Sequence, residues 1–219
     1  SLKAVQDGSA TWQPAGTTPA QVIYLNEAGV HGKVLRRSQT GTDNTDVLTF
    51  PAVSNGVITI QFDARASTAS TRTLDVFLLP SSGGETCLLG FGTVSGKLGY
   101  YDGAQWVAVR DLDTSWHRIE MVSHLSGPKF QSGDLKVDDA LLATNLSWRN
   151  NHPANTAYSR LRFGGIRGTA GTYADVDNLI LTAEVPVTPP EEFTLRDPAS
   201  GTGGFRFRIQ SETNRDYLV

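Results

Sequence analysis

Residues 57–63 read Val-Ile-Thr-Ile-Gln-Phe-Asp, and from residue 58 onward apolar and polar side chains alternate. Successive side chains of a β-strand point to opposite faces of its sheet. The alternation therefore places Ile58, Ile60 and Phe62 on one buried face and the polar residues on the other. This stretch predicts a half-buried strand, as is common in antiparallel sheets.

The same pattern recurs along the chain, whereas helical periodicity is nearly absent. Alternating runs stop at clusters of Gly, Asn, Asp, Ser or Pro, as residues 74–79 do before Pro80. Asp102-Gly103 is a strong hairpin signal between two runs. Other strand-like runs cover residues 11–12, 21–25, 33–36, 86–91, 97–101, 106–110, 116–123, 135–137, 159–163 and 176–184. Short strands at this spacing, without helices between them, predict an all-β, two-sheet antiparallel jelly-roll sandwich.

The C-terminal part of the chain differs from the rest in composition. Residues 1–185 hold the regular strand-like runs and are predicted to form one jelly-roll domain. Residues 186–192 are Pro-rich and predict an extended linker. Residues 193–219 contain further strand-like runs, which are either the start of a second β-domain or extra strands packed on the first. Both readings stay open at this stage.

Composition and charge exclude several classes of protein. The 19 Lys and Arg residues against 22 Asp and Glu give a net charge of −3, so no electrostatic attraction to nucleic acid or an anionic membrane is expected. No apolar run is long enough to span a bilayer. The single cysteine, Cys87, precludes an internal disulfide and a Cys-based zinc site. Because residue 1 is Ser rather than Met, we expect either a processed, secreted or cell-surface form or a fragment.

Four segments resemble the concanavalin A-like (laminin-G-like) jelly-roll superfamily. They are residues 57–65, 115–121, 133–139, and 161–166 leading to 173–181. In that superfamily a strand opening with Trp precedes a hairpin, and a strand with an Asp-Asn pair closes the domain; Trp116 and Asp177-Asn178 match these features. The resemblance covers about residues 1–185 and implies a carbohydrate-binding-module-like fold, with Trp116 serving the core. The fold hosts lectins, glycosidases, lyases and adhesive modules, so it does not fix the function.

Charged residues on two predicted strands form the first candidate site. Alternation places Arg118 and Glu120 on one strand face, and Arg160 and Arg162 on another. If these strands are neighbours, the four side chains form one patch suited to an acidic polysaccharide. The alternative is a set of cross-strand ion pairs on a solvated face. The paired-carboxylate motif of the fold's glycosidases, Glu-x-Asp-x-x-Glu, is missing, whereas a lyase using this face is harder to exclude.

Aromatic residues form the second candidate site, because sugar rings stack on flat aromatic faces. Tyr101 and Trp106 flank the Asp102-Gly103 hairpin, and Trp148 lies in the polar loop of residues 145–153. The alternative for all three is ordinary packing under loops, since Trp is highly buried on average.

Calcium is the third candidate ligand. The resemblance implies a structural Ca²⁺ held by an Asp near the closing strand together with carbonyl oxygens of the N-terminal segment. Asp177 matches that position, and Asp175 lies on the same strand face. Carboxylate and carbonyl oxygens are the ligands that this hard cation prefers. The alternative is that Asp177 and Asn178 accept hydrogen bonds from backbone amides of a loop.

These observations predict a secreted, non-catalytic carbohydrate-binding module of a larger modular protein, one that recognises a polysaccharide. One alternative is a polysaccharide lyase or glycoside hydrolase acting on the concave sheet. Another is a structural or adhesive module that recognises a protein or a second copy of itself. In the first case, Tyr101, Trp106 or Trp148 stacks on the sugar, and Arg118, Arg160 and Arg162 pair with carboxylates or sulfates.

Overall fold

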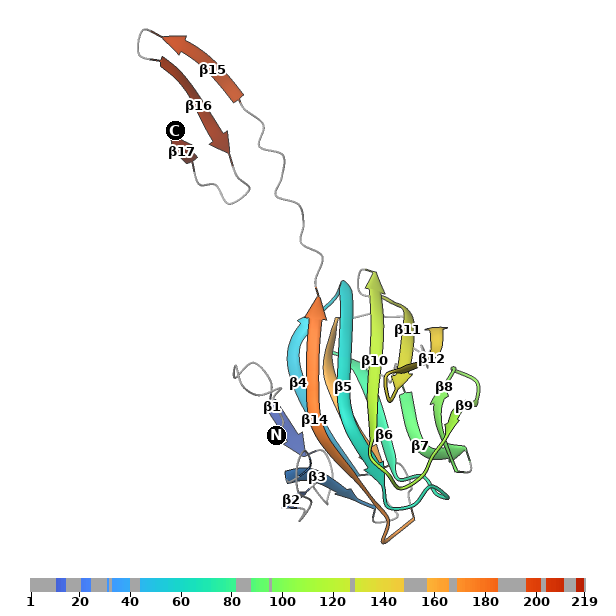
Figure 1. The fold of residues 1–219 in the computed structure, drawn as a ribbon. Coiled ribbons are helices and arrows are strands. Elements are labelled where there is room, and N and C mark those ends of the chain that lie inside the picture. Colours follow the sequence, from blue (N-terminus) through green and yellow to red (C-terminus); the bar gives the residue numbers. More distant parts are fainter. Residues whose placement is uncertain are drawn as a thin grey trace. The chain divides into compact units, whose positions relative to one another are not determined.

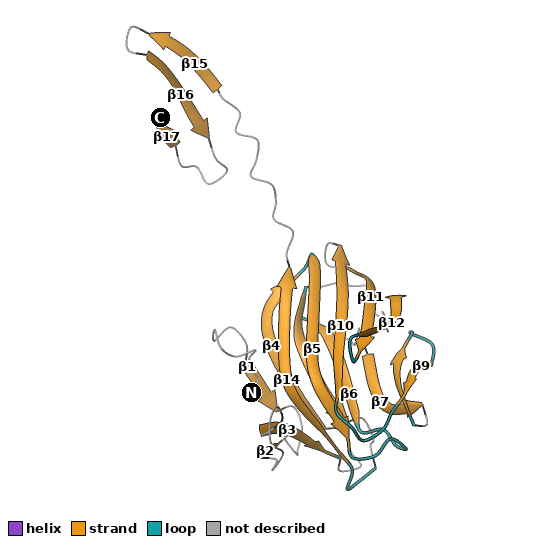
Figure 2. Cartoon of the chain, in the orientation of Figure 1, coloured by secondary structure: helices purple, strands orange, loops and turns teal. Residues whose placement is uncertain are grey.

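The chain is all-β, and its first part, residues 1–185, contains two antiparallel sheets that confirm the predicted sandwich (Figure 1). The computed structural model describes residues 11–14, 21–24, 31, 33–39, 44–81, 88–94, 96–126, 129–147, 157–165, 169–184, 196–201, 204–210 and 216–218. The described residues contain strands and connecting loops and no helix (Figure 2). Accordingly, no described helix is of the length and apolarity that crossing a membrane requires.

Sheet A has seven described strands. Their spatial order is β1 (Thr11–Pro14), β4 (Asn44–Val53), β13 (Tyr158–Gly165), β6 (Leu74–Pro80), β7 (Leu88–Val94), β8 (Lys97–Tyr101) and β9 (Trp106–Asp111). Sheet B also has seven. Their order is β12 (Ala140–Leu146), β11 (Lys129–Val137), β10 (His117–Ser126), β5 (Gly56–Ala66), β14 (Tyr173–Glu184), β3 (Lys33–Ser38) and β2 (Gln21–Tyr24). Figure 1 shows β14, β5 and β10 side by side.

The hydrophobic core lies between the two sheets and is built from the alternation that the sequence displays. Ile58, Ile60 and Phe62 of β5 are fully buried, as predicted. The ring of Phe62 meets that of Phe163 on sheet A edge to face, with 5.5 Å between centroids. Burying such side chains contributes about 1.5–3 kcal/mol each. The inward faces of both sheets are thereby fixed, and the alternate residues of each strand face outward.

Strand β6 departs from this alternation, because all seven of its residues are buried. Its outward-facing Phe77 and Leu79 form a second apolar cluster with Leu88 of β7, and Tyr101 and Trp106 pack against that cluster. Sheet A therefore carries apolar and aromatic side chains on its outer face as well as in the core.

The chain divides into two compact units, residues 1–185 and 186–219. The two seven-stranded sheets belong to the first unit. The second contains a three-stranded antiparallel sheet in the order β15 (Arg196–Gly201), β16 (Gly204–Gln210) and β17 (Asp216–Leu218). Whether it is the start of a further domain stays a prediction.

Candidate functional site

The four charged residues predicted to form one patch lie on two different sheets. Arg118 and Glu120 belong to β10 of sheet B, whereas Arg160 and Arg162 belong to β13 of sheet A. Their neighbours in sequence enter the common core, so each pair faces away from it on its own side of the sandwich. The prediction that the four side chains form a single patch is therefore wrong. Alternation identifies the face of a strand, but it does not identify the sheet to which the strand belongs.

The outer face of sheet A brings together several of the predicted residues. We call this surface the sheet A face. It comprises the outward side chains of β13, β6, β7, β8 and β9 with Arg72, which precedes β6: Arg160, Arg162, Asp75, Phe77, Leu79, Leu88, Tyr101 and Trp106. Tyr101 and Trp106 are cross-strand partners whose rings meet edge to face at 5.6 Å. Both are half-buried, and so are Arg160 and Arg162.

A row of glycines shapes the middle of this face. Gly164, Gly90 and Gly99 lie in one cross-strand row with Asp75. A Cβ atom on Gly90 would lie 2.3 Å from Thr93 Cγ2 and 2.9 Å from the Trp106 ring. Real Cβ atoms do not approach other atoms so closely. Glycine at position 90 is therefore what allows the Trp106 indole to lie against β7.

A buried ion pair adjoins the Trp106 ring. Asp75 is fully buried and accepts a hydrogen bond of 2.8 Å from Arg72 Nε. The Arg72 guanidinium lies 5.2 Å from the centre of the Trp106 ring, within cation–π range. A carboxylate, a guanidinium and an indole therefore adjoin one another on the sheet A face. Of these groups, the partly exposed Arg72 guanidinium can donate hydrogen bonds to a ligand and the half-buried Trp106 ring can stack on an apolar surface, whereas the buried Asp75 carboxylate orients Arg72.

The two predicted arginines of β13 have structural contacts. Arg160 donates from Nε and Nη2 to the Pro80 carbonyl oxygen, at 3.0 and 2.6 Å. The Arg162 guanidinium lies 3.8 Å from the centre of the Phe77 ring. Both side chains thus help to cover the apolar cluster. The third predicted aromatic, Trp148, lies outside the described residues.

The outer face of sheet B consists mainly of paired charges. Arg36 donates to both oxygens of the fully buried Asp175, at 2.7 and 2.8 Å, and Arg65 donates to the same carboxylate at 3.0 Å. The bond to Asp175 raises the pKa of Arg36, against the opposing effect of burial. Glu120 accepts from Lys136 Nζ at 2.6 Å and from Gln61, and these bonds lower the pKa of Glu120. We call the residues Arg36, Arg65, Asp175, Glu120 and Lys136, together with Arg118, Asp63 and Asp177, the sheet B face.

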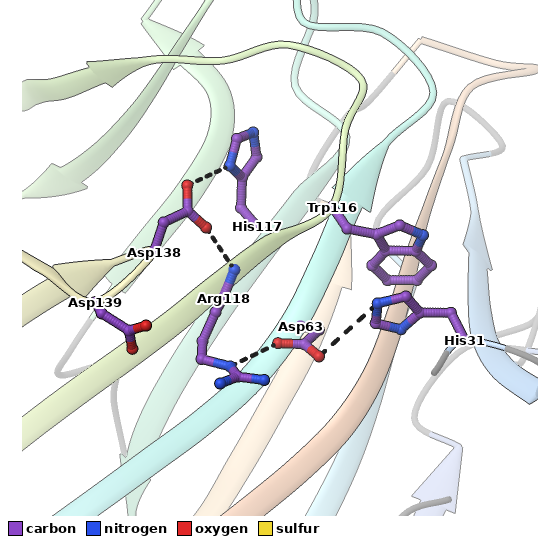
Figure 3. Close-up of a pocket in the computed structure, with 7 residues that line it drawn as sticks. All are labelled: His31, Asp63, Trp116, His117, Arg118, Asp138 and Asp139. Atoms are coloured by element: carbon purple, nitrogen blue, oxygen red, sulfur yellow. Dashed lines mark hydrogen bonds and ion pairs between the residues drawn. The ribbon is translucent and has the colours of Figure 1, made fainter. Parts of the chain in front are cut away.

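A pocket of about 260 Å³ opens at one end of the sheet B face (Figure 3). It is lined by His31, Asp63, Trp116, His117, Arg118, Asp138 and Asp139. Of these residues, the sequence predicts Arg118 as a binding residue, with Asp63 and His117 as candidate neighbours of the charged patch. Trp116, expected in the core, is half-buried at the pocket, where its ring stacks on His31 at a centroid distance of 4.0 Å. The contribution of His31 has no sequence signal, because it lies 32 residues before Asp63 and outside any motif.

The opposite wall of the pocket is a tight turn anchored by Asp138. Asp138 and Asp139 both have left-handed backbone angles, with φ of 51° and 63°, between β11 and β12. The Asp138 carboxylate contacts His117 Nδ1 at 2.9 Å and accepts from the Arg118 backbone N–H at 3.0 Å and from Arg110 at 2.6 Å. Burial alone raises the pKa of Asp138, but these hydrogen bonds outweigh it and leave the pKa below its usual value.

The two predicted calcium ligands have different surroundings. Both oxygens of Asp175 accept from arginines, as described above. Asp177 Oδ1 accepts from the backbone N–H of the next residue, Asn178, which belongs to β14 and not to a loop. Among the described residues, no group of three or more His, Cys, Asp or Glu side chains is arranged to bind a metal ion. The predicted carbonyl ligands fall largely outside the described residues, so the calcium site stays a prediction.

Comparisons with known proteins support the fold. No protein-family model matches the chain, and no curated protein matches it in sequence. Among solved structures, a sialidase shares 13% identity over 78% of this chain, with a TM-score of 0.58, and this chain spans only 17% of the sialidase. A carbohydrate esterase from the Shiga toxin-encoding bacteriophage phi24B has a TM-score of 0.57 and 15% identity, over 84% of this chain and 96% of its own. An endo-β-1,4-glucuronan lyase from the fungus Trichoderma reesei has a TM-score of 0.51 and 12% identity, over 78% of this chain and 90% of its own. At such identities these likenesses show that the chain shares their β-sandwich fold.

Proposed function

We propose that residues 1–185 are a non-catalytic carbohydrate-binding module that recognises a polysaccharide on the sheet A face. The observation that carries the proposal is the juxtaposition of the half-buried Trp106 ring with the Arg72–Asp75 pair. Sugar rings present apolar C–H faces and equatorial hydroxyls, so an indole beside a partly exposed guanidinium, which the buried Asp75 holds in place, matches both parts of a sugar. The three similar folds described above all have names that refer to carbohydrates.

The apolar cluster beneath these groups supports a binding role. Phe77, Leu79 and Leu88 are buried under Tyr101 and Trp106, which holds the two rings at fixed positions on the sheet. A platform that is rigid before the ligand arrives loses little conformational entropy on binding. We also propose, as the sequence predicts, that this module belongs to a larger secreted or cell-surface protein.

Calorimetry with the full chain tests this proposal. Titration with a panel of neutral and acidic polysaccharides should identify at least one ligand, and Trp106→Ala should weaken its binding at least tenfold, because truncating an aromatic anchor costs more than about 1.4 kcal/mol. Tyr173→Ala is the matched control. Tyr173 is also a half-buried aromatic contacting an arginine, Arg36, but it lies on sheet B. Equal losses in both variants would place the site elsewhere.

Two further results would replace the proposal by an alternative. If the chain releases unsaturated uronate products from an acidic polysaccharide, it is a polysaccharide lyase and not a non-catalytic module. A chain that binds no glycan and forms defined multimers in solution would instead favour the structural or adhesive module.

A further inference from the structure

Two buried carboxylates face each other on neighbouring strands at the edge of the pocket. Asp63 of β5 and Asp177 of β14 are register partners, and their side chains are only 7% and 3% exposed. Two carboxylates buried so close together require donors or positive charges around them. Groups around Asp63 and Asp177 must therefore compensate the burial of the two carboxylates.

Asn178 and Arg118 supply part of the compensation. Asn178 donates from Nδ2 to Asp63 Oδ2 at 2.7 Å and from its backbone N–H to Asp177 Oδ1 at 2.8 Å. Arg118 donates from Nε to Asp63 Oδ1 at 3.2 Å. Asn178 reaches both aspartates because it has a left-handed backbone, with φ of 48°, at an irregularity in the β14–β5 pairing. One oxygen of Asp177, Oδ2, is directed toward neither of these residues.

His31 lies beside that oxygen. Its Nδ1 is 3.3 Å from Asp177 Oδ2. Its Nε2 is 4.0 Å from Asp63 Oδ2, and Figure 3 shows this pair. The imidazole is held in this position by the Trp116 indole, whose plane is tilted by 12° from its own. The two ring nitrogens thus face the two aspartates, one each.

The residues present do not fit a calcium ion between these aspartates. Calcium takes six to eight oxygen ligands. Here Asp175 is bound by two arginines, and Asp63 accepts from Arg118 and Asn178. One oxygen of Asp177 accepts from Asn178, and the other contacts the imidazole. The donors named here are all nitrogen atoms of the chain itself.

We infer that His31 occupies the place predicted for the calcium ion, so that the chain supplies its own bridge between Asp63 and Asp177. The bridge joins the segment before β3 to β5 and β14, and the Trp116 stack fixes it. In consequence, the folded domain does not depend on calcium, and His31 is the positioning residue for the buried aspartate pair.

Thermal unfolding of the full chain, stripped of metal and then measured with and without millimolar calcium, tests the inference. The wild-type melting temperature should be the same in both conditions. His31→Ala should melt several degrees lower without calcium and recover part of the loss with it, because removal of the imidazole opens space beside Asp177 Oδ2 and Asp63 Oδ2 that the ion can enter with water as further ligands. His124→Ala is the matched control, since His124 pairs with Asp134 at 3.3 Å on the exposed part of sheet B. This variant should resemble the wild type in both conditions.

Three outcomes would overturn the inference. One is a wild-type chain that calcium stabilises, particularly if Asp177→Asn removes the effect. Another is a His31→Ala variant as stable as the wild type. The third is a destabilised His31→Ala variant that gains nothing from calcium, which would reduce His31 to an ordinary packing contact.

Discussion

Asp175→Asn perturbs a fully buried carboxylate that two arginines bind. The wild-type carboxylate is fully buried and accepts three hydrogen bonds of 2.7, 2.8 and 3.0 Å from Arg36 and Arg65. The variant removes the negative charge and leaves two guanidinium groups facing a neutral amide. Breaking a buried pair by removing one partner costs about 3–5 kcal/mol. Because Arg36 and Arg65 are 24% and 20% exposed, water takes over part of their solvation, and we expect the lower end of that range, about 3 kcal/mol.

Urea denaturation followed by tryptophan fluorescence measures the loss in the free energy of unfolding, and a thermal melt of the same variant should agree with it. Against a total stability of about 5–15 kcal/mol, a 3 kcal/mol loss should lower the melting temperature by about 6–12 °C for a domain of this size. Asp111→Asn is the matched control, because Asp111 pairs with Lys97 but is 83% exposed. This variant should leave the free energy of unfolding nearly unchanged, because water and salt screen an exposed pair. A loss below about 1 kcal/mol for Asp175→Asn would refute the reasoning from buried charge. A loss that appears only when calcium is present would show that Asp175 is a metal ligand.

Two further predictions concern the sheet A face and the turn at the pocket. Gly90→Ala should destabilise the domain by about 1–3 kcal/mol, because the new Cβ displaces Trp106 or Thr93. It should also weaken glycan binding measured by calorimetry. An unchanged affinity would show that Trp106 does not belong to the binding site. The pKa of Asp138 is depressed in the folded state, so its contribution to stability is present above the unfolded value of about 3.8 and is lost as the pH falls through the lower folded value. Melting temperatures measured across acidic pH should therefore fall less steeply in Asp138→Asn than in the wild type, and parallel curves would contradict this assignment.

The strands and their buried faces follow from the sequence, because one alternating pattern specifies both. Ile58, Ile60 and Phe62 are buried as the alternation predicts. Arg118 and Arg162 were placed correctly on outward faces but wrongly on one surface, since sheet membership depends on long-range pairing that periodicity does not encode. The approach of His31 to Asp177, across 146 positions of sequence, depends on the same kind of pairing.

The two outer faces differ in what a glycan would have to displace. On the sheet B face, Asp175, Asp63 and Glu120 already accept charge-assisted bonds from neighbouring strands. Sugar hydroxyls there would replace bonds worth about 1.5–3 kcal/mol with neutral bonds worth about 0.5–1.5 kcal/mol, which is unfavourable.

On the sheet A face, the half-buried rings of Tyr101 and Trp106 continue the apolar surface of the Phe77 cluster. A sugar ring placed on them removes apolar area from water, at about 25 cal/mol per Å². The sugar ring does not have to displace the hydrogen bonds that Arg160 donates to the Pro80 carbonyl oxygen, because these bonds lie beside the apolar cluster. Both comparisons lead to the same conclusion. A neutral or weakly charged glycan gains more binding free energy on the aromatic sheet A face than on the ion-paired sheet B face. Trp106, rather than the arginines singled out by the alternation, is the residue on which the affinity should depend most.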